Sequence, residues 1–329
     1  MTARLPSDIE EWKEAAQRAG VNLRTSVHTR GPFMSGSRVV EEEFLLLRTI
    51  WPKVPLADKW QVQKKLGLDA QFRKADDYLG GIQEFENYLD AIGEEIPPKN
   101  TTNLGLFWLP YEQQQRLIQI LKSGPTTNQR AYGKNEELVN ASLVNFLQAV
   151  CGKHRDVHSD WNPARVKLTF DFRKIKMGKE TGELRSDVFS LSCQIDGFLE
   201  SSSTFRAQAI LEAKALGRKN HEPKVSWQET MEMVTALLTE HPKKKLLKDR
   251  VTLFAQTGAE MYLLHASHKD GYSQYMQGAP GKRTVRQDEF VEIRRYGPYL
   301  IAKKEDVGYF AKLALAVALR ASEEEDERT

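Results

Sequence analysis

Two acids and a lysine in neighbouring β-like segments are the residues of this chain best suited to chemistry. Asp196 ends an alternating apolar run over residues 189–195, and Glu212 and Lys214 lie two residues apart in the next apolar run. Side chains at i and i+2 of a strand point to the same face. We therefore expect Glu212 and Lys214 to point together and Ala213 to point away. A hairpin that brings Asp196 beside them would gather two carboxylates and one ammonium group.

This grouping predicts a metal-dependent hydrolytic site. Carboxylate oxygens are the ligands that Mg²⁺ and Mn²⁺ prefer, and a lysine beside them can orient an attacking water. The acid-x-Lys pattern also occurs at 11–13, in a helix-like segment, and at 222–224, where a proline disfavours an inner strand. The alternative is a strand edge whose charges face solvent. Burial of three charges is costly unless they pair with each other or with a cation.

The order of acid, hairpin, Glu-x-Lys and helix resembles the PD-(D/E)XK (restriction-endonuclease-like) nuclease superfamily, in a divergent form of fungal type. The resemblance covers roughly residues 130–320. It implies that Asp196, Glu212 and the carbonyl of Ala213 hold Mg²⁺ or Mn²⁺ while Lys214 acts on the attacking water. One departure is Ile195, which stands where the family often has proline.

The resemblance also implies contributions from two helices. A glutamate of the preceding helix, expected over 135–150, would complete the metal site, and both Glu136 and Glu137 are candidates. Gln228, near the start of a helix expected over 226–240, would support the catalytic group.

The expected function is hydrolysis of phosphodiester bonds, with DNA favoured as the substrate. One alternative keeps the nuclease-like fold without catalysis, as a module that binds nucleic acid or protein. Another is a scaffolding protein in which the acid–lysine grouping is accidental. The sequence leaves open a homodimer, a protein partner for the N-terminal region, and the choice between DNA and RNA.

The chain is expected to be an α/β protein with a mixed central sheet flanked by helices, preceded by a mainly helical N-terminal region. We divide it into a helical region at 1–125, a nuclease-like domain at 130–321 and an acidic disordered tail at 322–329. The turn-rich segment 123–128 marks the boundary. Expected helices cover 39–49, 69–92, 111–121, 135–150, 226–240 and 306–321. Expected strands cover 166–173, 187–196, 207–215, 251–255, 261–265 and 290–295, the last ending at a turn at 297–298.

Charge and cysteine content bear on partners and compartment. Between residues 201 and 321 there are 20 Lys and Arg against 13 Asp and Glu, a balance that favours a nucleic-acid partner. No apolar run is long enough to span a bilayer. Two cysteines provide no disulfide framework and favour an intracellular location, in the nucleus or the cytoplasm. The basic run at 241–245 is a weak signal for a nuclear address.

Overall fold

The computed structural model describes residues 4–21, 26–28, 33–92, 103–122, 136–177, 184–215, 217–218, 221–239, 249–276 and 285–327. The boundary predicted at 123–128 and the basic run at 241–245 lie outside these ranges. The helices are α1 (Ile9–Arg18), α2 (Glu41–Leu46), α3 (Val62–Lys65), α4 (Asp69–Gly80), α5 (Gln83–Ala91), α6 (Trp108–Lys122), α8 (Glu136–Cys151), α9 (Lys224–Thr239), α10 (Asp270–Met276) and α11 (Lys304–Asp326). The strands are β1 (Thr49–Ile50), β2 (Ser159–Asn162), β3 (Val166–Met177), β4 (Leu184–Ile195), β5 (Gly197–Ser201), β6 (Ala207–Lys214), β7 (Arg250–Thr257), β8 (Glu260–His268) and β9 (Val291–Leu300).

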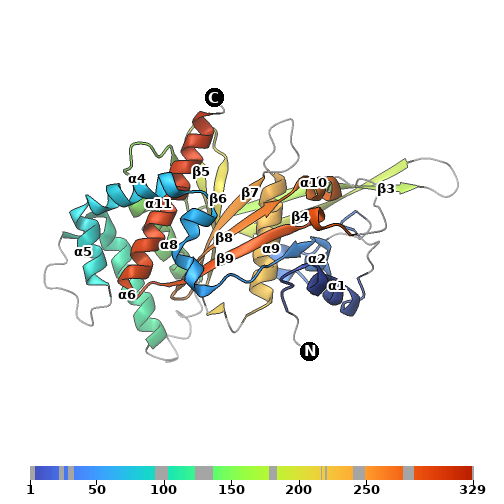
Figure 1. The fold of residues 1–329 in the computed structure, drawn as a ribbon, viewed down its shortest axis with the longest axis horizontal. Coiled ribbons are helices and arrows are strands. Elements are labelled where there is room, and N and C mark those ends of the chain that lie inside the picture. The colour runs from blue at the N-terminus through green and yellow to red at the C-terminus, as the bar shows by residue number, and fades with distance from the viewer. Residues whose placement is uncertain are drawn as a thin grey trace.

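The described strands form a seven-stranded mixed sheet in the order β1-β9-β8-β7-β6-β5-β2, and β3 pairs with β4 as a separate ribbon. Strands β6 and β7 are parallel and are connected through α9, whereas β5–β6, β7–β8 and β8–β9 are antiparallel. Helices lie on both sides of the sheet (Figure 1). The predicted class, a mixed sheet flanked by helices after a helical N-terminal region, is therefore confirmed.

The chain bends at Asp196, where it passes from the β3–β4 ribbon into the seven-stranded sheet. Strands β4 and β5 are separated by this single residue, and β2 and β3 are separated by 163–165. Gly197 makes the bend possible, because a Cβ at this position would lie 2.7 Å from the backbone oxygen of Asn162 and 2.9 Å from a methyl carbon of Leu211. The close approach of two strands therefore excludes a side chain beside the acid.

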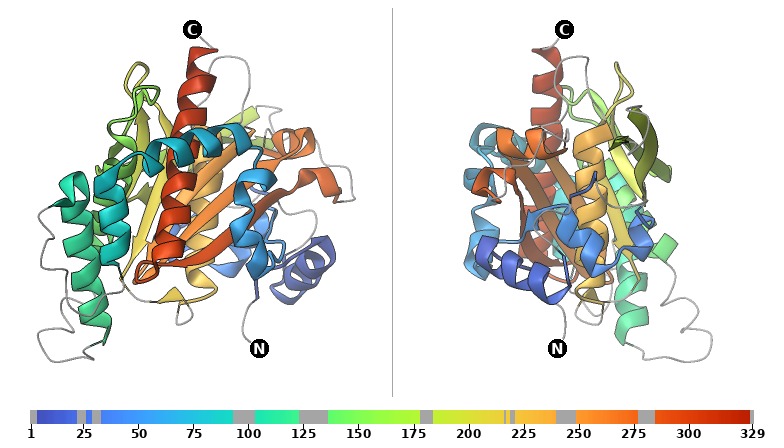
Figure 2. Two further views of the ribbon diagram at one scale, coloured as in Figure 1. Left: turned by 60° about the vertical axis from the view of Figure 1, so that its left-hand side comes forward. Right: turned by 90° about the vertical axis from the view of Figure 1, so that its right-hand side faces the viewer.

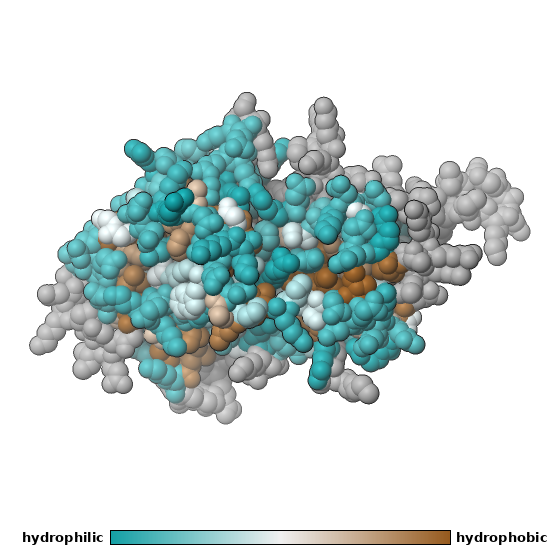
Figure 3. Space-filling model, viewed as in Figure 1, coloured by the Kyte–Doolittle hydropathy of each residue, from teal (hydrophilic) through white to brown (hydrophobic). Residues whose placement is uncertain are grey.

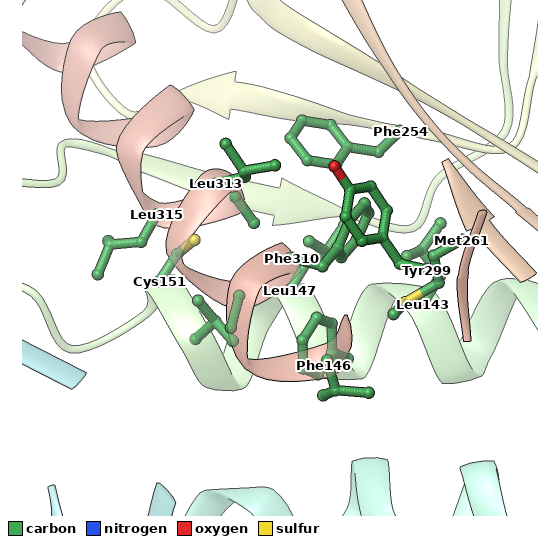
Figure 4. Packing of buried hydrophobic residues seen from close by; sticks show 14 of the residues in the cluster. Leu143, Phe146, Leu147, Cys151, Phe254, Met261, Tyr299, Phe310, Leu313 and Leu315 are labelled. Carbon is green, nitrogen blue, oxygen red and sulfur yellow. The ribbon is translucent and has the colours of Figure 1, made fainter. Parts of the chain in front are cut away.

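Two apolar cores hold the sheet, one on each face. Helix α9 covers one face with α1 and α2, and α8 and α11 cover the other (Figure 2). In the second core Phe254 and Tyr299 of the sheet pack against Phe310 of α11, and the rings of Phe310 and Phe146 are 6.3 Å apart (Figure 4). Because β6 contributes Ile210 to the first core and Leu211 to the second, alternate residues of this strand face opposite sides.

The helical N-terminal region contributes to both cores. Trp12 and Phe44 pack in the core beneath α9, whereas Phe85 and Tyr88 pack in the core beneath α11. The region also provides β1, which pairs with β9 in parallel. The helix predicted over 39–49 is shorter in the structure, and Thr49, the last residue of the predicted range, begins β1. This strand was not predicted, because two residues are too few to show an alternating pattern in the sequence.

The acidic C-terminal segment is helical to Asp326, so the prediction of a disordered tail from residue 322 was wrong for the described part. Its acids have partners distant in the sequence. Lys74 donates to Glu323 at 2.7 Å, and Gln208 at the β5–β6 hairpin donates to Glu325 at 3.1 Å. Thr204 of the hairpin tip also donates to Glu325, at 2.9 Å, so the tip is bound rather than simply solvated.

Most other predicted elements are present with shifted ends. The single helix predicted over 69–92 is two helices, α4 and α5, and the turn predicted at 297–298 lies inside β9. Gly297 takes a φ of +127° there, and the pairing of β8 with β9 is irregular nearby. The strand continues because glycine accepts a backbone angle that other residues avoid.

The surface in Figure 3 is mostly hydrophilic, and brown atoms emerge in separate areas. Exposed large apolar side chains include Leu106, Trp108 and Leu109 around the start of α6. None of the helices in the described ranges has the length and apolar character to cross a membrane.

The bend at Gly197 generates the first prediction. Gly197→Ala should lower the free energy of unfolding by about 1–3 kcal/mol, since the added methyl group meets a backbone oxygen that cannot rotate away. Gly80→Ala is the control, because nothing lies within 4 Å of a Cβ there. In helix α4 it should stabilise by about 0.5–1 kcal/mol. Urea unfolding measures both, and equal stabilities of the two variants would contradict this account of the bend.

Candidate active site

Strand β6 places Glu212 and Lys214 on the face covered by α9, and Ala213 on the opposite face. Ala213 is buried in the core beneath α11. The ammonium group of Lys214 donates a hydrogen bond to Oε1 of Glu212. Glu212 is the more deeply buried of the two: its side chain is 2% exposed, and that of Lys214 is 19% exposed.

The bend between β4 and β5 brings Asp196 to the end of β6. Its backbone N–H donates to the carbonyl of Leu211 at 3.1 Å, and its Oδ2 accepts from the N–H of Ala213 at 3.0 Å. Its Oδ1 lies 3.1 Å from Nε of Arg165, in the segment between β2 and β3. The acid is thus held against the Glu-x-Lys segment by its own backbone and by its carboxylate.

Helix α9 supplies the predicted polar residue. Nε2 of Gln228 donates to Oε1 of Glu212 at 2.6 Å and to Oε1 of Glu232 at 2.8 Å. Gln228 therefore bridges two carboxylates, one from the strand and one from its own helix. The parallel connection from β6 to β7 positions α9 directly over this part of the sheet.

Helix α8 approaches from the side. Oε1 of Glu136 lies 3.7 Å from Nζ of Lys214, whereas Glu137, the other candidate, is exposed at the next position. Nδ2 of Asn140 donates to the backbone carbonyl of Asp196 at 2.9 Å, and its Oδ1 has no hydrogen-bond partner among the described residues. The helix thus fixes the bend and brings one carboxylate to the lysine.

Three residues of this group were missed from the sequence. Arg165 and Asn140 reach Asp196 only because of the bend, which has no local signal. Glu232 had a signal, because it lies four residues after Gln228 in an otherwise apolar stretch of α9. A charge at a helix position that faces the core is unusual, and this could have singled it out.

The acids in the site outnumber the cations close to them. Burial raises the pKa of Glu212 above its ordinary value, the charge of Lys214 opposes this rise, and the charge of Asp196 adds to it. Burial and the charge of Glu212 raise the pKa of Glu232 well above its ordinary value. Burial alone would lower the pKa of Lys214, but the carboxylates of Glu212 and Glu232 outweigh it and raise this pKa.

We conclude that Lys214 is charged and that Glu212 and Glu232 retain one proton between them. We assign this proton to Glu232, because Glu212 accepts a hydrogen bond from the ammonium group of Lys214, whereas Glu232 forms no ion pair among the described residues. Oε2 of Glu232 has no hydrogen-bond partner among the described residues, which is costly for a buried ionised carboxylate. Glu229, one turn earlier on the helix, has a cationic partner, because the guanidinium group of Arg218 donates a hydrogen bond to each of its carboxylate oxygens.

The donor atoms suit a hard divalent cation. Within the ranges that the structure describes, no group of three or more His, Cys, Asp and Glu side chains could hold a metal ion. Mg²⁺ does not require such a group, because it is commonly held by one or two carboxylates together with water and substrate phosphate oxygens. Asp196 and Glu212 provide two carboxylates, and each has a side-chain cation, Arg165 or Lys214, within contact distance. Both carboxylates thus already lie in positions that favour positive charge.

Competing nucleophile and metal sites are weaker. Cys193 is buried on β4, and burial raises the pKa of its thiol, so it is not a thiolate nucleophile. The ring of His154 packs on Tyr78 at 4.6 Å, and burial lowers the pKa of His265 to about 4. These histidines are accounted for by packing.

No family model, curated protein or solved structure matches the chain. The assignment to the PD-(D/E)XK superfamily therefore stays a prediction from the sequence, and the function is argued from the site alone.

The contrast between Glu232 and Glu229 can be tested by stability. Glu232→Gln should change the free energy of unfolding at neutral pH by about 1 kcal/mol or less, because glutamine has the shape of the protonated acid. Glu229→Gln should cost about 3–5 kcal/mol, because it leaves Arg218 buried without its counter-charge. Equal losses in urea unfolding would show that Glu232 is ionised.

The same proton gives a pH dependence. Above about pH 4.5 the unfolded chain releases the proton of Glu232 and the folded chain keeps it, so this residue's contribution to stability falls as pH rises. As the pH rises above about 5, Glu232→Gln should therefore lose less stability than the parent does. A steeper loss in the variant would contradict the raised pKa.

Proposed function

We propose that the protein is a metal-dependent phosphodiesterase, a nuclease that acts on DNA. The observation that carries the proposal is the convergence of Asp196, Glu212, Lys214 and Gln228, from a strand bend, a strand end and the helix above them, at one end of the sheet. Their order along the chain and their contacts fit the arrangement that the family resemblance implies.

The residues divide into a cation-binding part and a positioning part. Asp196 and Glu212 would hold Mg²⁺ or Mn²⁺, with the Ala213 carbonyl and Glu136 as further oxygen donors. Bound there, the ion would supply Lewis-acid stabilisation of the phosphate oxygens. Gln228 keeps the Glu212 carboxylate in one orientation through its hydrogen bond at 2.6 Å.

The lysine acts as a fixed positive charge. With its pKa raised, Lys214 keeps its proton and cannot serve as a general base. It can donate a hydrogen bond to the attacking water and stabilise the negative charge that develops on the phosphate in the transition state. Its partial exposure, in contrast to the buried Glu212, supports a position of Lys214 next to the substrate.

The alternative is a nuclease-like fold that binds nucleic acid without cutting it. Ion pairs from Asp196 to Arg165 and from Glu212 to Lys214 satisfy the acids internally, and this observation favours it. A protein partner or a second copy remains compatible with either function. Both described cysteines are free and buried, and we place the protein inside the cell.

Asp196→Asn should abolish Mg²⁺- or Mn²⁺-dependent cleavage of labelled single- or double-stranded DNA or RNA, with a rate loss of more than about a hundredfold. The physical reason is the loss of a charged oxygen ligand at the bend. Asp160→Asn is the matched control, since Asp160 is an exposed acid on β2 and should leave the rate unchanged. EDTA should stop the parent.

Equal cleavage by the Asp196→Asn and Asp160→Asn variants would overturn the site assignment. A parent that shifts labelled nucleic acid in a gel but never cuts it, with either ion, would instead support the binding-only alternative. Circular dichroism of each variant separates a chemical effect from unfolding.

A further inference from the structure

A second charged group lies on the other side of the first turn of α9. The guanidinium of Arg218 binds Glu229 on one side and lies 3.4 Å from Oε1 of Glu222 on the other. Arg295, on β9, donates to the same oxygen of Glu222 at 2.7 Å. The hydroxyl of Ser226 lies 2.7 Å from the second oxygen. Two guanidinium groups and a hydroxyl therefore surround one carboxylate.

The depth of these groups differs in an informative way. The side chains of Arg218 and Glu229 are 4% and 1% exposed, so this ion pair is buried. The side chains of Glu222 and Arg295 are 26% and 31% exposed, so they lie at the solvent-facing side of the group. Nε of Arg218 has no hydrogen-bond partner among the described residues. The carboxylate of Glu222 can leave the group without moving the buried pair.

The surroundings match those that proteins use for phosphate. Paired arginines and a hydroxyl offer several N–H and O–H donors to an oxyanion, and the carboxylate lies just before the first turn of the sixteen-residue helix α9, at its positive end. Burial alone would raise the pKa of Glu222, but Arg218, Arg295 and Ser226 lower it, as expected of a strong anion site.

The position relative to the candidate active site follows from strand register. Glu212 of β6 is opposite Ala255 of β7, which is opposite Tyr262 of β8. The guanidinium of Arg218 lies over the Tyr262 ring, at 4.6 Å from its centroid. Two strand spacings separate Glu212 from Tyr262, or about 10 Å. The second group therefore lies on the same face of the sheet, within reach of one extended ligand.

We propose that Arg218, Arg295 and Ser226 form a phosphate-binding subsite in which the carboxylate of Glu222 is a built-in stand-in for the ligand. The shared chemistry is a phosphate group, and the favoured source is the backbone of a nucleic acid held at the candidate active site. That source rests on the proposed function, whereas the anion site itself does not. A phosphodiester carries one negative charge, so exchange for the carboxylate leaves the charge of the group unchanged.

The test uses the full chain with Asp196→Asn and EDTA, so that cleavage plays no part. Glu222→Gln should raise the affinity for inorganic phosphate by about tenfold, measured as the phosphate-dependent rise in Tm against chloride at equal ionic strength. Addition of Arg295→Gln to the Glu222→Gln variant should remove this gain in phosphate affinity. Glu292→Gln is the matched control, since it also takes a carboxylate from an arginine at 2.7 Å, and no second arginine of the described ranges forms an ion pair with Glu292.

A second arm identifies the source of the phosphate. If the backbone is the ligand, Glu222→Gln should tighten binding of a short single-stranded DNA, and Arg295→Gln should weaken it. Tighter phosphate binding with unchanged DNA binding would assign the subsite to a free phosphate compound.

The proposal is overturned if Glu222→Gln and Glu292→Gln respond equally to phosphate, because Glu222 is then only an internal ion-pair partner. Glu222→Ala, which also removes the carboxylate, gives the same readout if the glutamine variant fails to fold. Neither outcome depends on whether the parent is a nuclease.

Discussion

The structure depends on the burial of more acids than bases between β6 and α9. Glu212, Glu229 and Glu232 are all enclosed there, and charges are buried in proteins only when they are compensated. Arg218 compensates one of them completely, Lys214 compensates the second, and a proton compensates the third. This imbalance leaves a site that attracts positive charge at the end of the sheet, and it explains why Gln228 must bridge the two remaining carboxylates.

The N-terminal region helps to maintain this arrangement. Trp51, just after β1, donates from its indole N–H to the hydroxyl of Thr230 on α9 at 3.2 Å. The ring of Phe44 stacks on that of Trp227 at 5.9 Å. Because these contacts fall on the same helix as Gln228 and Glu232, residues before 125 support the site, although none of those that the structure describes is among its charged groups. An N-terminal module that folds apart from the sheet does not agree with this packing.

The sequence was sufficient to predict those parts of the site that depend on the residue pattern within one strand. The period of a strand placed Glu212 beside Lys214, and the alternation before Asp196 marked the strand that carries this acid to them. It was insufficient for contacts between residues that lie far apart in the chain. Arg165 and Asn140 meet Asp196 only through the bend at Gly197, and β1 exists only because β9 is there to pair with it. The acidic end of α11 was predicted to be disordered because its partners, such as Lys74 and Arg250, lie far away in the chain.

The most direct test of the central claim is a calorimetric titration of Mn²⁺ into the parent and into Glu212→Gln, in the absence of nucleic acid. If the buried acids form a cation site, the parent takes up Mn²⁺ and releases protons as it does so, since positive charge beside Glu212 lowers the pKa of the neighbouring Glu232. The Glu212→Gln variant should bind at least about tenfold more weakly. Identical binding curves, or no uptake by the parent, would show that the acids at the end of β6 serve only one another.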